Sequence, residues 1–146
     1  MDTMTEERQA TTTGQRGVDS TRPDTREWLG QKISGELALF VGVAWYVLFS
    51  IAVALEPDAT QPEAFPAWLS VAIEVALLGL LAVTAVGLVT RRRVGLVAAL
   101  GAAGLFLAMA VACPVSGHHG FGAWWYGQMA CAIGLVAITG TALRRS

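Results

Sequence analysis

The chain has 146 residues, of which 54% are hydrophobic and only 14% are charged, and its formal net charge is −1. Soluble domains carry about 25% charged residues, so this composition excludes a compact soluble fold covered by polar side chains. A nearly neutral chain also lacks the large basic surface that nucleic acids bind. The length allows one domain, and we expect that domain to lie in a lipid bilayer.

Residues 1–27 differ in composition from the rest of the chain. They are rich in Thr, Arg and acidic residues and contain no apolar segment of the kind found in a signal peptide. Such a segment buries too little apolar area to offset the entropy lost on ordering. We therefore expect a disordered tail.

Four apolar runs follow. They cover residues 37–55, 67–90, 94–113 and 123–143, and the second of them contains the one charged residue, Glu74. A hydrocarbon core of roughly 30 Å is crossed by about 20 residues of helix. None of the runs alternates apolar with polar residues, as membrane strands do. The sequence predicts an all-α, integral membrane four-helix bundle over residues 28–146.

The basic residues predict the orientation of this bundle, because Lys and Arg near span ends stay in the cytoplasm. Basic residues before the first run, the turn at residues 91–93 and the end of the chain at Arg144 and Arg145 all fall on one side. The two opposite joints, residues 56–66 and 114–122, contain no Lys or Arg. We expect an N-in/C-in topology with a cytoplasmic tail. The preference for Arg, Ala and Gly is typical of GC-rich genomes and predicts a bacterial plasma membrane.

Small residues at four-residue spacing predict close helix packing. They occur in all but the first run, as Gly79, Val83 and Gly87, as Gly104, Ala108 and Ala112, and as Gly127, Cys131 and Gly134.

Glu74 is the most informative candidate functional residue. It lies eight positions into its run, roughly 12 Å from the outer end at helical rise. A charged group at the centre of a membrane helix costs on the order of 2.5–3.5 kcal/mol. We expect Glu74 to face the bundle or a wet cavity, either as a general acid or as a hydrogen-bonding group between helices. Tyr46, in the first run, also needs a polar partner at its depth.

His118 and His119 are the two histidines of the chain, and both lie in the joint at residues 114–122. Imidazole and the nearby thiol of Cys113 are good ligands for copper or zinc, but the spacing matches no established metal motif. The pair therefore suggests a metal site, an acid–base pair near neutral pH or a solvated turn, and no cofactor is identified. Cys113 and Cys131 differ in depth by roughly 10 Å, so we expect small buried cysteines and no disulfide.

Aromatic residues are dense where the fourth run begins, at Trp124, Trp125 and Tyr126, and Gln128 follows them. This pattern is typical of an interfacial aromatic belt. It also suits the wall of a pocket with Gln128 as its polar contact.

Three hypotheses about function follow from these residues, and the sequence leaves it open whether the protein is an enzyme. The first is an accessory protein, or a binder of a lipophilic small molecule, with a polar site in the outer half of the bundle. It includes membership of a membrane complex or a homo-oligomer. The second is a membrane enzyme, an isomerase or cyclase, in which Glu74 and Tyr46 act as acid and His118 or His119 as base. The third is metal or redox handling at the outer face through the His pair.

Overall fold

The computed structural model describes residues 24–57, 66–117 and 121–146. They form a short helix and four long ones: α1 (Thr25–Gly30), α2 (Gly35–Ala54), α3 (Ala67–Val89), α4 (Arg93–Val115) and α5 (Ala123–Arg145). The described segments contain no strand, and each long helix has the length and hydropathy to cross a membrane. The predicted all-α membrane bundle is confirmed, and the chain is a multi-pass membrane protein in contact with lipid.

The ends of the long helices lie within two residues of the predicted ones. Helix α2 begins two residues before its apolar run because the Ser34 hydroxyl accepts a hydrogen bond from the Leu37 N–H at 3.2 Å and caps the helix. At the boundary between the predicted tail and the bundle, α1 begins at Thr25. The predicted limit of the tail at residue 27 therefore falls inside a helix, and the tail before residue 24 lies outside the described part.

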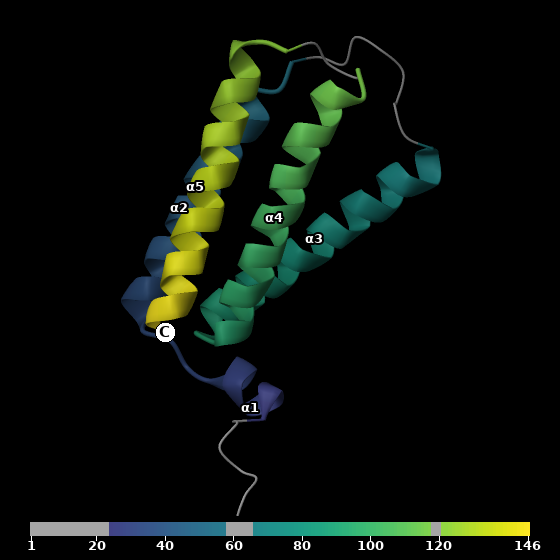
Figure 1. The fold of residues 1–146 in the computed structure, drawn as a ribbon. Coiled ribbons are helices and arrows are strands. Elements are labelled where there is room, and N and C mark those ends of the chain that lie inside the picture. The colour runs from purple at the N-terminus through teal and green to yellow at the C-terminus, as the bar shows by residue number, and fades with distance from the viewer. Residues whose placement is uncertain (1–23, 58–65, 118–120) are drawn as a thin grey trace, which may run out of the picture.

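The basic residues gather at one end of the bundle. Figure 1 shows that α1, the α3–α4 turn and the end of α5 lie at this end. We call it the basic end. The positive-inside rule predicts that this end faces the cytoplasm, and we call the other end, where α2 and α4 finish, the outer end.

The segment between α1 and α2 is fixed to the α3–α4 turn. The Ile33 N–H donates to the Arg91 carbonyl at 2.8 Å, and the Arg93 N–H donates to the Gln31 carbonyl at 3.0 Å. The Arg93 guanidinium carbon also lies 5.3 Å from the centre of the Trp28 ring, in a cation–π contact. These contacts join the basic end into one unit.

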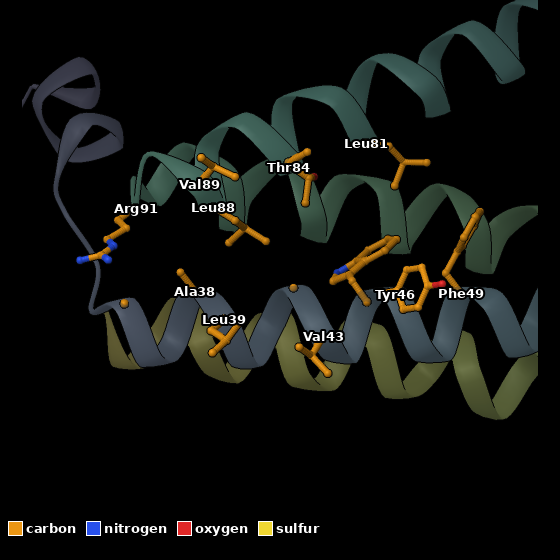
Figure 2. A pocket seen from close by; sticks show the side chains of 14 residues that line it. Ala38, Leu39, Val43, Tyr46, Phe49, Leu81, Thr84, Leu88, Val89 and Arg91 are labelled. Atoms are coloured by element: carbon orange, nitrogen blue, oxygen red, sulfur yellow. The ribbon is translucent and has the colours of Figure 1, made fainter.

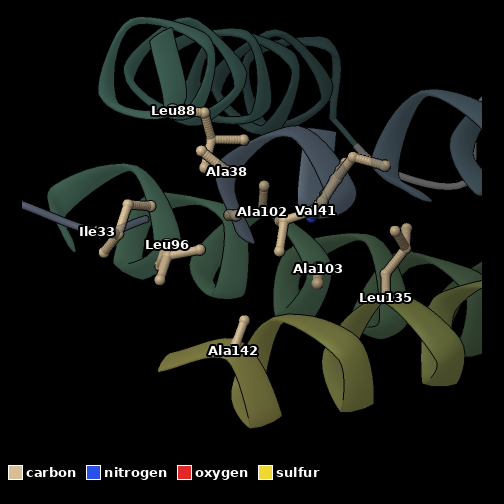
Figure 3. Close-up of a cluster of buried hydrophobic side chains, with 11 residues drawn as sticks. Ile33, Ala38, Val41, Leu88, Leu96, Ala102, Ala103, Leu135 and Ala142 are labelled. Atoms are coloured by element: carbon tan, nitrogen blue, oxygen red, sulfur yellow. The ribbon is translucent and has the colours of Figure 1, made fainter. Parts of the chain in front are cut away.

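Helix α4 packs against both α3 and α5, and α2 packs against α5. The core is largely Ala and Leu, including Leu96 and Leu135 (Figure 3). The backbones of α3 and α4 touch at Gly87 and Gly95, where a Cβ on Gly95 would lie 2.6 Å from the Gly87 carbonyl carbon. The small-residue face predicted for α3 is thus used at Gly87.

The small-residue face predicted for α4 is wrong. Gly104 and Ala108 are exposed, while Ala99 and Ala103 are fully buried. Alanine occurs on every side of α4, so the four-residue spacing does not distinguish the packed side from the lipid side.

Helix α3 leans away from the bundle. From its contact with α4 near the basic end, it diverges toward the outer end, as Figure 1 shows in teal. It makes most of its contacts with α4 and few with α2. The lean leaves a gap between α2 and α3.

Candidate functional site: a groove between α2 and α3

The gap between α2 and α3 forms a groove of about 670 Å³ in the half of the bundle nearer the basic end. The lining residues are Gly35, Ala38, Leu39, Gly42, Val43, Trp45, Tyr46 and Phe49 of α2, Leu81, Thr84, Ala85, Leu88 and Val89 of α3, and Arg91 of the turn. Figure 2 shows α3 rising away from α2 along the groove, from Arg91 toward Leu81. The volume lies within the range of about 300–1,000 Å³ that is usual for ligand sites.

Small residues keep the groove open. A Cβ built on Gly42 would meet Leu88 only at 3.9 Å, and Ala38 and Ala85 add little volume to the two walls. Trp45 is buried behind them, and its indole N–H donates to the Thr139 hydroxyl of α5 at 3.1 Å. This hydrogen bond fixes the Trp45 ring, so the α2 wall is anchored to the bundle.

The two ends of the groove carry polar groups. At the basic end, Arg91 has a left-handed backbone with φ of 56°, and its guanidinium carbon would lie 3.1 Å from a Cβ on Gly35. Near the middle of the bundle, Tyr46 is 77% exposed. Within the described part of the chain, neither the Arg91 guanidinium nor the Tyr46 hydroxyl has a hydrogen-bond or ion-pair partner.

Glu74 is exposed and is not packed among the residues of the bundle core, so the prediction that it faces the bundle or a wet cavity stays a prediction. The physical reason for its exposure is the lean of α3, which carries its outer half away from α2. Glu74 lies seven residues before Leu81 and eleven before Ala85, and these spacings place all three on one side of a helix. Glu74 therefore lies on the side of α3 that lines the groove, beyond its outer end. No hydrogen bond joins it to Tyr46 or to any other described residue.

Gln128 was predicted as a ligand contact, but it caps a helix. Its side chain is 5% exposed, and its amide N–H donates to the Ala52 carbonyl at 3.1 Å. In a regular helix the Glu56 N–H would donate to this carbonyl, but at the end of α2 it donates to the Val53 carbonyl at 3.2 Å. Gln128 therefore satisfies a carbonyl that the helix leaves without a partner.

Trp125 has a comparable role beside Pro114. A proline has no N–H, so within α4 Pro114 leaves the carbonyl four residues before it, that of Ala110, without its helical partner. The indole N–H of Trp125 donates to this carbonyl at 2.9 Å. This replacement lets α4 continue through Pro114 to Val115, two residues beyond the predicted end.

The other predicted site residues do not converge on one place. Trp124 is half-buried and Tyr126 is 70% exposed, with its ring centre 5.2 Å from that of Trp125. His118 and His119 lie outside the described residues, so the metal hypothesis stays a prediction. Among the residues that the structure describes, no three His, Cys, Asp or Glu side chains gather as metal ligands would.

Both cysteines are free thiols. Cys131 is buried between helices, and Cys113 is half-buried near the outer end of α4. The prediction of a small buried cysteine therefore holds for Cys131 but not fully for Cys113.

Comparison of the chain with protein-family models, with curated proteins and with solved structures finds no match.

Proposed function

We propose that this protein is a non-catalytic membrane protein that binds a lipophilic molecule in the groove between α2 and α3. The observation that carries the proposal is the groove itself, with its volume of about 670 Å³ and its almost wholly apolar lining. Because the groove lies between two membrane-spanning helices, a lipophilic molecule reaches it sideways from the bilayer. The site thus lies nearer the basic end than the outer-half site expected from the sequence.

The geometry favours binding over catalysis. A general acid acts within about 2.6–3.2 Å of the atom to which it transfers a proton. The side chains of Gln128 and Trp125 are engaged with backbone carbonyls. Among the described residues, no hydrogen bond joins Glu74 to Tyr46 across the gap between α2 and α3 or gives either side chain another partner.

One observation still supports an enzyme as the second candidate. Glu74 lies on the groove side of α3, so its carboxyl group borders the same gap as a bound molecule. An enzyme of the isomerase or cyclase type would lose turnover in Glu74→Gln. A binding protein would retain its ligand in that variant.

A photoreactive lipid tests the proposed binding function. The protein is reconstituted in vesicles that contain a phospholipid with a diazirine on one acyl chain, irradiated, and mapped by peptide mass spectrometry. We expect crosslinks to concentrate on residues 38–49 and 81–89, and Ala85→Leu, which fills the groove, to reduce them several-fold.

The matched control is Ala76→Leu. Ala76 lies nine residues before Ala85, half a turn around α3 at 100° per residue, and it is also exposed. It adds the same volume to the same helix outside the groove, so the crosslinks should persist. Crosslinks spread evenly over all lipid-facing surfaces, with both variants alike, would contradict the proposal.

A further inference from the structure

We propose that the groove takes an anionic phospholipid from the leaflet at the basic end, with the phosphate of its headgroup bound by Arg91. This inference rests on the proposed binding function and adds the chemical class of the ligand. Its basis is the backbone, the surroundings and the position of Arg91.

The backbone of Arg91 closes the end of α3, where the Arg91 N–H donates to the Leu88 carbonyl at 3.1 Å and the Arg92 N–H to the Gly87 carbonyl at 2.8 Å. With φ of 56° it adopts the left-handed conformation, which glycine takes without strain and a bulky side chain does not. The positive-inside rule does not require an arginine at this strained position, because Arg92 and Arg93 follow it in the same turn. An arginine at this position also places a guanidinium at the end of the groove.

The surroundings of Arg91 leave its guanidinium available. The group lies against Gly35, which has no side chain to cover it. No described acidic residue forms an ion pair with it. By contrast, Arg93 lies over the Trp28 ring. Of these arginines, only Arg91 lines the groove.

The shape and charge of the groove select the ligand. Its α2 wall runs from Gly35 to Phe49, about 21 Å at helical rise, and one leaflet contributes roughly 15 Å, half of the hydrocarbon core. The groove therefore accommodates an acyl chain with its headgroup at the basic end. Guanidinium groups bind phosphate through paired charge-assisted hydrogen bonds. Because no acidic side chain lines the groove, nothing there pairs with the cationic group of a zwitterionic lipid.

A second groove provides an internal control. It lies between α2 and α5 at the same end, has Arg145 at its edge and a volume of about 330 Å³, half that of the first. A purely electrostatic attraction of anionic lipid to the basic end would involve Arg92 and Arg145 as much as Arg91.

The test compares lipid binding by variants of these three arginines. Wild type, Arg91→Gln, Arg92→Gln and Arg145→Gln are titrated in detergent with dioleoyl phosphatidylglycerol or dioleoyl phosphatidylcholine. Bound lipid is counted by native mass spectrometry, and the thermal midpoint Tm is followed in parallel. In wild type, Arg92→Gln and Arg145→Gln, we expect phosphatidylglycerol to bind about tenfold more tightly than phosphatidylcholine. In Arg91→Gln, we expect this preference to disappear.

Arg91→Gly separates binding from folding. Glycine suits the left-handed backbone, so without added lipid its Tm should equal or exceed that of wild type. Its preference for phosphatidylglycerol should nevertheless be lost. A preserved preference in both Arg91 variants would overturn the headgroup assignment.

The remaining outcomes separate this inference from the proposed function. An equal loss of the preference for phosphatidylglycerol in all three glutamine variants would show a diffuse charge effect and overturn the inference. Equal binding of the two lipids by wild type, abolished by Ala85→Leu, would keep the groove as a binding site and reject Arg91 as its headgroup site. Equal binding of both lipids by Ala85→Leu and wild type would overturn the proposed function as well.

Discussion

Helices α5 and α3 are both 23 residues long, but they are joined to the bundle in different ways. Among the described residues, side-chain hydrogen bonds connect α5 to α2 through Thr139 and Gln128, and to α4 through Trp125. The described side chains of α3 make none to another helix, because Thr84 bonds to the Leu80 carbonyl of its own helix. Helix α3 relies on contact between its small residues and α4.

This difference explains where the groove lies. Lipid tails are as apolar as leucine, so apolar burial does little to hold membrane helices together. Helices α2, α4 and α5 form a frame with hydrogen bonds between them. Helix α3 is held near Gly87 and leans away beyond that point. We therefore expect the groove to depend on α3 and the frame to depend on α5.

The largest effect should come from the glycine contact of α3. In Gly87→Ala the new Cβ would collide with backbone atoms of Gly95, which cannot rotate away as a side chain would. We expect α3 to detach and the free energy of unfolding to fall by about 3 kcal/mol. Titration with a denaturing detergent, followed by circular dichroism, measures this change.

Gly79→Ala is the matched control on the same helix. Nothing lies within 4 Å of a Cβ at this position, so no contact is disturbed. Alanine favours a helix over glycine by about 0.5–1 kcal/mol, and the variant should be as stable as wild type or slightly more so. Equal losses in the two variants would mean that the Gly87–Gly95 contact does not hold α3.

The second effect concerns the indole of Trp125 that replaces the missing N–H of Pro114. Trp125→Phe leaves the Ala110 carbonyl without its donor, which should lower the free energy of unfolding by about 1–2 kcal/mol. Pro114→Ala restores a backbone donor in α4. In the Pro114→Ala variant, Trp125→Phe should lower the free energy of unfolding clearly less than it does in the wild type. Additive losses in this double-mutant cycle would show that the two residues act independently.

The third effect concerns the hydrogen bond between Trp45 and Thr139. Thr139 is fully buried, and in Thr139→Val the Trp45 indole N–H loses its acceptor at nearly constant volume. We expect a loss of about 1 kcal/mol, as is usual for hydrogen bonds between membrane helices. Thr141→Val, at an exposed position of α5, is the control and should change stability little. A larger loss in Thr141→Val would contradict this assignment.

Composition made the spans predictable, since they depend on the order of apolar and polar residues, whereas the orientation stays a prediction from the basic residues. Helix rotation was not predictable, because the helices are apolar all round and alanine covers every side of α4. The roles of Gln128 and Trp125 were missed for a related reason. A polar side chain at a helix mouth suits a ligand contact as well as a cap, and only the three-dimensional position of the carbonyls of Ala52 and Ala110 separates the two.

A sequence signal for the groove existed on α2. Leu39, Gly42, Tyr46 and Phe49 follow one another at spacings of three and four, so one side of the helix combines a glycine with aromatic residues. Without the lean of α3, this stripe is equally suited to helix packing. The lean arises from contacts distant in sequence, which one span does not encode.

The smallest effect should come from Glu74→Gln. The carboxyl group is exposed on the part of α3 that leans away, and no described residue bonds to it. An amide of nearly the same shape should therefore change the free energy of unfolding by less than about 0.5 kcal/mol. A loss well above 1 kcal/mol, together with a change in oligomeric mass, would mean that another chain covers Glu74. Contact with that second chain would then position helix α3. The difference between α3 and α5 in how they are joined to the bundle would hold only for the single chain.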